Sequence, residues 1–174
     1  MKKLKDMRQI VTKNGDAGTS KDYVGDIHPK NDVLFDCLGT IDELSSSLGL
    51  SYHYCHESSI KHIQRILQKI ASLVATPSDH ELRKKIDGVS DDDIAFLETA
   101  IQQELDTKDI ETAFVLPGSE QSKKGAYLNM SRAVTRRCER VFTAFIGDKD
   151  DEELKRGLAF MNRLSDYLYV LAHD

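Results

Sequence analysis

Hydrophobic residues recur through most of the chain at steps of three, four or seven positions, the spacing that places them on one face of an α-helix. Five segments carry this pattern. The first begins near Asp32, the second near Ser59, the third after Ser90 and the last near Asp151, while the fourth lies in a basic region near residue 130. The apolar positions of the five segments are Leu34, Cys37, Ile41, Leu44, Leu48 and Cys55, then Ile60, Ile63, Leu67, Ile70 and Val74, then Ile94, Leu97, Ile101 and Leu105, then Met130, Val134, Cys138, Val141 and Phe145, then Leu154, Leu158, Met161, Leu164, Leu168 and Leu171. We therefore predict five amphipathic helices.

The segments between these patterns hold the residues that end helices and form turns. Residues 12–26 include three glycines and no sustained apolar period, which indicates a loop, with a short strand predicted at Gln9–Thr12. Thr76-Pro77 ends the second helix. Residues 77–90 are polar and charged and predict a mobile connection. Ser90, which three aspartates follow, is a strong N-cap for the third helix.

Five helices joined by short or moderate connections predict an all-α fold, an up-down five-helix bundle. We assign residues 31–174 to the helical bundle and residues 1–30 to a glycine-rich loop region that precedes it. At 174 residues the chain is long enough for a single domain, residues 1–174, with a core of its own.

The composition narrows the class of protein. Hydrophobic residues make up 40% of the chain and charged residues 30%, which is ordinary for a soluble globular protein. There is no run of 18 apolar residues, so we expect no membrane span, and the basic N-terminus lacks the apolar part of a secretory signal. Cys37, Cys55 and Cys138 are odd in number, which favours reduced thiols in a cytoplasmic protein. An isoelectric point near 5.7 argues against general binding of nucleic acid.

The fourth segment concentrates basic charge. Between Lys123 and Arg140 there are six basic residues and one acidic residue, a local balance of +5 in a chain of net charge −5. At 100° per residue, Arg132, Arg136 and Arg140 lie nearly opposite the apolar stripe of their helix. We call these three residues the arginine face.

Two interpretations of the arginine face are open. Runs of charge are usually solvated helix faces. However, this face contains arginine only, which suits bidentate contacts to phosphate or carboxylate. Arginines four residues apart also repel one another unless an anion lies between them. If an anion binds here, a part of the molecule outside the core of this helix must complete the site.

The loop region offers a second candidate for anion binding. Gly15 and Gly18 flank Asp16, and glycines allow consecutive backbone N–H groups to approach a ligand closely. Lys13, Lys21 and Lys30 supply nearby positive charge. The spacing is not that of a Walker A loop, and a plain surface loop is the alternative interpretation.

The sequence gives little support for a metal site built from protein side chains or for a catalytic nucleophile. A ferritin-like di-iron bundle needs Glu-x-x-His pairs on two helices, and the sequence has none. Three histidines lie near one another in the sequence, but none has a carboxylate or cysteine partner at metal-ligand spacing. We therefore predict that His53, His56 and His62 are surface residues. No serine or cysteine stands in a nucleophile motif.

Five motifs, taken together and in order, resemble those of a known family. They are Thr12-Lys13-Asn14-Gly15-Asp16-Ala17-Gly18-Thr19, Gly39-Thr40-Ile41-Asp42-Glu43-Leu44, Phe114-Val115-Leu116-Pro117-Gly118, Ser131-Arg132 with Arg136-Arg137-Cys138-Glu139-Arg140, and Asn162-Arg163-Leu164-Ser165-Asp166-Tyr167-Leu168. The set is similar to that of the ATP:cob(I)alamin adenosyltransferases of the propanediol-utilisation (PduO) type. The resemblance covers residues 10–172.

This resemblance implies a transferase that moves the 5′-deoxyadenosyl group of ATP to the cobalt of a reduced corrinoid, cob(I)alamin. The products would be adenosylcobalamin and triphosphate. It also implies a homotrimer of five-helix bundles with Mg²⁺-dependent active sites between subunits, supplied with reduced corrinoid by a reductase. The alternative is a non-catalytic sensor or delivery protein for ATP or corrinoid on the same fold.

The resemblance also assigns roles to individual residues. Arg132, Arg136, Asp42 and Phe114 would be catalytic, with Asp42 pairing with Arg132 across the subunit boundary and Phe114 walling the lower face of the cobalt. ATP would be held by Thr12, Lys13, Gly15, Asp16, Gly18, Thr19, Lys30, Arg136, Glu139, Arg140 and Asn162, and Glu139 would also hold the metal ion. The chain departs from the family pattern at Ser45, Ser119 and Asn129, although Ser119 is a fair N-cap for the fourth helix.

Overall fold

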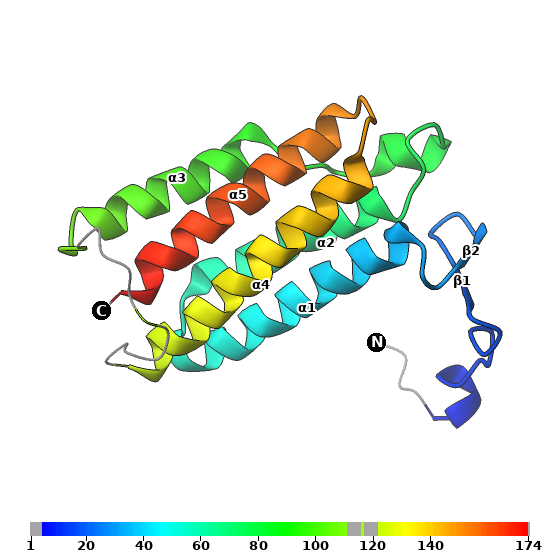
Figure 1. The fold of residues 1–174 in the computed structure, drawn as a ribbon, viewed down its shortest axis with the longest axis horizontal. Helices are drawn as coiled ribbons and strands as arrows, with labels where there is room; N and C mark the ends of the chain where they lie inside the picture. Colours follow the sequence, from blue (N-terminus) through cyan, green and yellow to red (C-terminus); the bar gives the residue numbers. More distant parts are fainter. Residues whose placement is uncertain (1–4, 111–115, 117–121, 174) are drawn as a thin grey trace.

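The structure is a computed structural model that describes residues 5–110, 116 and 122–173, and its main elements are five α-helices (Figure 1). They are α1 (Val33–Cys55), α2 (Ser58–Val74), α3 (Asp91–Leu105), α4 (Lys123–Ile146) and α5 (Glu152–Ala172). The predicted five-helix bundle is therefore confirmed. None of the helices in the described ranges is long and apolar enough to cross a membrane.

Side chains at the helix starts explain where most of the helices begin. Asp32, Ser90 and Asp151 each accept hydrogen bonds from backbone N–H groups of the following turn, as the sequence predicted for Ser90. The N-cap of α4 is Ser122, which accepts from the first turn in the same way. The expectation that Ser119 would cap this helix is therefore wrong, and Ser119 itself lies outside the described residues.

The core lies where the apolar stripes of the helices meet. Helix α4 runs between α1 and α5, and α3 covers α5 on the other side (Figure 1). Two predicted core positions are wrong: Met130 is 61% exposed and Leu105 is 44% exposed. Because α4 contacts helices on both sides, its buried stripe is centred on Ser131, Thr135 and Phe142, and Met130 falls at the edge. Leu105 is exposed at the last residue of α3.

The loop region contains a small hairpin. Strand β1 (Thr19–Lys21) pairs antiparallel with strand β2 (Ile27–Pro29). A strand predicted at Gln9–Thr12 is wrong, because a 3-10 helix, η1 (Met7–Gln9), overlaps that segment. Strands of three residues are too short to show an alternating pattern in the sequence.

Local hydrogen bonds build this hairpin and attach it to the bundle. The Oδ1 atom of Asp22 accepts from the backbone N–H groups of residues 24–26 at 2.8–3.0 Å, which closes the turn. The backbone N–H of Tyr23 donates to the carbonyl oxygen of Ala75 at 3.0 Å. The hairpin therefore lies against the end of α2, beyond the start of α1 (Figure 1).

The connection from α2 to α3 is more ordered than the sequence predicted. It contains a 3-10 helix, η2 (Glu81–Lys85). Arg83 in this helix donates to the carbonyl oxygens of Leu73 and Thr76 and forms an ion pair with Asp151 at 2.6 Å. Polar residues of this connection thus form hydrogen bonds and an ion pair that attach the turn to the bundle.

Candidate active site

The arginine face lies away from the core of its own chain, as the periodicity predicted. Arg136 and Arg140 are exposed and Arg132 is half-buried, while the opposite side of α4 is buried. In the described ranges, none of the three arginines forms an ion pair with a carboxylate. Three uncompensated guanidinium groups on one helix face form an electropositive surface that suits a polyanion.

The neighbouring Arg137, by contrast, is neutralised within the chain. Its guanidinium pairs with Glu43 on α1, and the hydrogen bond to Glu43, with the charge of that carboxylate, raises the pKa of Arg137. Asp42, next to Glu43, is exposed and does not pair with Arg132 in the single chain. Of these two neighbouring acidic residues, Glu43 thus binds α4 of its own chain, and Asp42 faces outward.

A chain of hydrogen bonds joins three helices beside the arginine face. The amide nitrogen of Asn162 donates to Oε1 of Glu139 at 3.1 Å, and Arg163 donates to the amide oxygen of Asn162 at 2.8 Å. Arg163 also contacts Glu98 on α3 at 2.9 Å. Glu139 is therefore held in place by α5, and Asn162 has only one orientation that satisfies both neighbours. The structure brings into contact Glu139 and Asn162, which the resemblance assigned separately to ATP. It also adds Arg163 and Glu98, whose contacts depend on helix neighbours that periodicity does not reveal.

Arg132 is oriented by groups on two helices. Its Nε donates to the side-chain oxygen of Asn129 at 3.1 Å, and its guanidinium carbon lies 5.9 Å from the centroid of the Tyr169 ring. His173 lies edge-on to the same ring at 4.6 Å. Neither Tyr169 nor His173 belongs to a motif or to the apolar stripe of the last helix, so the contact of Tyr169 with Arg132 was not predicted.

The glycine-rich loop closes around Lys30. Thr12, Asn14, Gly15, Thr19, Lys21 and Lys30 are among the residues that line a hollow of about 340 Å³. A Cβ atom on Gly15 would lie 2.7 Å from Nζ of Lys30, so a side chain at this position would displace the lysine. The backbone N–H of Lys30 donates to the carbonyl oxygen of Gly18, which has a φ of 76°, at 2.8 Å. The loop residues and Lys30 thus form one cationic hollow, while Lys13 and Asp16 are exposed beside it.

The loop and the arginine face do not meet in one chain. Figure 1 shows the N-terminal segment projecting from the end of the bundle where α1 begins. No hydrogen bond or ion pair joins the described residues 7–21 to α4 or α5. The other predicted catalytic residue, Phe114, lies outside the described residues.

The residues present fit a magnesium ion held mainly by a substrate. The described residues contain no group of three or more histidine, cysteine or acidic side chains that could hold a metal ion. Mg²⁺ needs no such cage, since it is usually bound by one or two carboxylates together with phosphate oxygens and water. Glu139 supplies one fixed, half-buried carboxylate beside the arginines.

Comparisons with known proteins give the family. The cobalamin adenosyltransferase family matches residues 10–174. Human corrinoid adenosyltransferase MMAB is 36% identical over 94% of this chain and 67% of that protein, and the corrinoid adenosyltransferase of Bacillus subtilis is 30% identical over 94% and 84%. A solved structure of a PduO-type ATP:corrinoid adenosyltransferase variant from Lactobacillus reuteri, complexed with cobalamin and ATP, has a TM-score of 0.83 and 28% identity over 94% of this chain and 91% of that chain. The protein belongs to the family of PduO-type ATP:corrinoid adenosyltransferases.

Proposed function

We propose that the protein transfers the 5′-deoxyadenosyl group of ATP to the cobalt of cob(I)alamin and releases triphosphate. The observation that carries this proposal is the arginine face. Arg132, Arg136 and Arg140 have no carboxylate partner in the described part of the chain, yet they lie beside a carboxylate, Glu139, that another helix holds in place. A triphosphate with a divalent ion matches both features.

In this reaction the protein positions the substrates and supplies positive charge, and it does not supply the nucleophile. Cobalt(I) supplies the electron pair that forms the bond to carbon 5′. The bond between carbon 5′ and its oxygen breaks, and its electron pair leaves on the triphosphate. Fixed arginines stabilise that growing negative charge, and holding the two substrates in line supplies much of the remaining acceleration. Mg²⁺, when bound at Glu139, would neutralise part of the phosphate charge.

The active site would be shared between copies of the chain. Thr12, Lys13, Gly15, Asp16, Gly18, Thr19 and Lys30 of one copy would hold ATP against Arg136, Glu139, Arg140 and Asn162 of the next copy. The separation of loop and arginine face within one chain supports this arrangement. Asp42, exposed on α1, would meet Arg132 of the partner copy and fix its direction. A homotrimer satisfies these contacts with three equivalent sites.

Binding and reduction of the corrinoid would require Phe114 and a source of electrons. Phe114 would form an apolar wall beneath the cobalt that keeps its lower face free of a ligand, which makes reduction of cobalt(II) easier. A separate reductase would deliver the electron. We place the reaction in the cytoplasm, where the reduced cysteines of the chain are stable.

An anaerobic assay tests the proposed function. The protein is incubated with ATP, Mg²⁺ and chemically reduced cobalamin, and the visible spectrum is followed for the alkylcobalamin product. We expect conversion that depends on both ATP and protein. Tight ATP binding without conversion would instead favour a non-catalytic sensor or delivery protein. Sedimentation that showed only monomers at micromolar concentration would contradict the shared site.

A further inference from the structure

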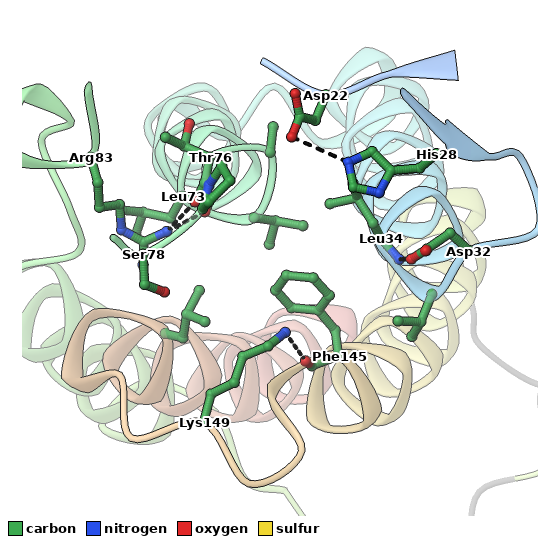
Figure 2. Close-up of a pocket in the computed structure, with 15 residues that line it drawn as sticks. Asp22, His28, Asp32, Leu34, Leu73, Thr76, Ser78, Arg83, Phe145 and Lys149 are labelled. Carbon is green, nitrogen blue, oxygen red and sulfur yellow. Dashed lines mark hydrogen bonds and ion pairs between the residues drawn. The ribbon is translucent and has the colours of Figure 1, made fainter. Parts of the chain in front are cut away.

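A second hollow lies on the bundle side of the hairpin (Figure 2). It measures about 330 Å³ and is bounded by the base of the hairpin, the start of α1, the end of α2 and the turn between α4 and α5. Ligand sites in proteins usually begin at about 300 Å³. Among the described residues, none of those assigned to ATP or to the metal ion lines this hollow.

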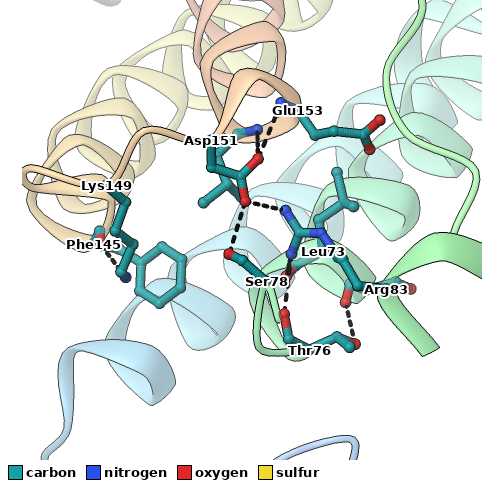
Figure 3. A network of polar contacts seen from close by, with 10 residues as sticks. Leu73, Thr76, Ser78, Arg83, Phe145, Lys149, Asp151 and Glu153 are labelled. Carbon is teal, nitrogen blue, oxygen red and sulfur yellow. Dashed lines mark hydrogen bonds and ion pairs between the residues drawn. The ribbon is translucent and has the colours of Figure 1, made fainter. Parts of the chain in front are cut away.

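A network of polar contacts forms the far wall of this hollow (Figure 3). Arg83 and Asp151, whose side chains are only 9% and 11% exposed, form an ion pair at 2.6 Å. Ser78 donates to the same carboxylate at 2.9 Å, and Arg83 also donates to the carbonyl oxygen of Thr76 at 3.0 Å. Burial alone would raise the pKa of Asp151, but hydrogen bonds from Leu154 and Ser78 and the charge of Arg83 together keep it below its usual value. A preorganised wall of this kind reduces the entropic cost of binding.

One cationic group at the rim retains unused hydrogen-bond donors. Nζ of Lys149 donates to the carbonyl oxygen of Phe145 at 2.6 Å and lies 3.7 Å from the centroid of the Phe145 ring. An ammonium group has three donors, and the described residues provide no acceptor for the other two. Partial burial lowers the pKa of Lys149. Figure 2 shows this ammonium group at the edge of the hollow.

The remaining lining determines the class of ligand. Leu34, Leu73 and Leu154 give the hollow an apolar interior. Asp22 and Asp32 also line it, but their Oδ1 atoms accept from backbone N–H groups of the hairpin turn and of α1. These two negative charges disfavour a polyanion such as a nucleotide. An apolar body with a single carboxylate matches both the interior and Lys149.

We propose that this hollow binds a small apolar or aromatic monocarboxylate and that the bound molecule strengthens ATP binding through the hairpin. His28 of β2 lines this hollow, while the adjacent Ile27 lines the hollow of the glycine-rich loop. Neighbouring residues of a strand face opposite sides, so the hairpin separates the two hollows. Lys30 follows β2 directly, and a ligand behind the hairpin therefore fixes the segment that carries this lysine.

The binding step is tested with benzoate in the absence of ATP. Benzyl alcohol, which lacks the charge of benzoate, is the control ligand. Calorimetry should show saturable binding of benzoate at millimolar concentration, and the proton NMR signal of His28, identified with a His28→Gln variant, should move during the titration. Lys149→Met should weaken benzoate binding by about tenfold, the effect of losing a charged hydrogen bond. Lys149→Arg and the control Lys84→Met, which changes an exposed lysine outside the hollow, should bind benzoate normally. If benzoate does not bind saturably, or if Lys149→Met binds benzoate as tightly as the unaltered protein, the proposed site is wrong. If benzyl alcohol binds as tightly as benzoate, the hollow does not require a carboxylate.

The second arm measures coupling and rests on the proposed function, because it assumes that the glycine-rich loop binds ATP. Saturating benzoate should tighten ATP binding by a few-fold in the unaltered protein and not in Lys149→Met. ATP must then tighten benzoate binding by the same factor. Unchanged ATP affinity overturns the coupling. If the protein binds no ATP, the first arm still decides whether the hollow binds benzoate, so the two failures are distinguishable.

Discussion

The side-chain amide of Asn162 donates to Glu139 at 3.1 Å while its oxygen accepts from Arg163 at 2.8 Å. Asn162→Asp keeps the acceptor for Arg163 and replaces the donor with a second carboxylate beside Glu139. The two like charges should repel one another and disturb the position of Glu139. We expect the affinity for Mg²⁺·ATP, measured by calorimetry, to fall by about tenfold or more.

The matched control changes an amide to an acid far from this site. Gln68→Glu alters an exposed residue on α2 and should leave the affinity for Mg²⁺·ATP unchanged. If Asn162→Asp binds Mg²⁺·ATP as tightly as the unaltered protein, Glu139 has no part in holding the nucleotide or its metal ion.

Arg136 is exposed and makes no ion pair with a carboxylate in the described ranges. Arg136→Ala should therefore leave the thermal unfolding temperature nearly unchanged. Loss of one positive charge that stabilises the leaving group should lower kcat/KM by roughly 100-fold. Arg65→Ala, which removes an exposed arginine from α2, should lower neither quantity. A large drop in the unfolding temperature of Arg136→Ala would contradict the placement of this residue off the core.

Tyr169 contacts Arg132 through its ring, and no hydrogen bond of its hydroxyl group is found among the described residues. Tyr169→Phe should retain kcat/KM. Tyr169→Leu should lower kcat/KM by about 2–30-fold, because cation–π contacts contribute about 0.5–2 kcal/mol. Steady-state kinetics at saturating corrinoid separates the two variants. Equal losses in both would show that the hydroxyl group, and not the ring, is required.

Asp151 should make stability depend on acid pH. Its pKa is lower in the folded protein than in the unfolded chain, so its contribution is present above about pH 4, the unfolded pKa of an aspartate. The contribution disappears as the pH falls through the folded pKa. Asp151→Asn leaves Arg83 buried without its partner and should cost about 3 kcal/mol at neutral pH.

Urea unfolding of both proteins at pH 7 and at a series of lower pH values checks this expectation. The difference in the free energy of unfolding between the two proteins should shrink as the pH decreases. A difference that stays constant down to strongly acid pH would show that the carboxylate of Asp151 is not what stabilises this turn.

The helices could be predicted because each has an uninterrupted apolar period and most have a polar cap in the sequence. The hairpin could not, since strands such as Thr19–Lys21 are too short to carry a pattern and depend on the turn around Asp22. Met130 follows the spacing of its helix but lies at the edge of the buried stripe. Burial at such positions depends on which helices are neighbours.

The same limit applies to the candidate site. The arginine face followed from the period of one helix, and the closure of the loop around Lys30 agrees with the resemblance to the adenosyltransferases. The pair of Arg137 with Glu43 and the contact of Arg132 with Tyr169 join different helices. No single helical period contains that information. The sequence therefore supplied candidate residues for the chemistry, but it did not indicate which neighbours orient them.

Subunit complementation tests most directly whether the two halves of the site come from different copies. Lys30→Ala damages the loop, Arg136→Ala damages the arginine face, and each variant alone should retain little activity in the adenosylation assay. Co-expression at equal levels produces mixed oligomers, which native mass spectrometry can verify. About one quarter of the sites would then combine an intact loop from one copy with an intact arginine face from another. We predict recovery of about one quarter of the unaltered activity; mixed oligomers with no activity above that of the separate variants would contradict the shared site.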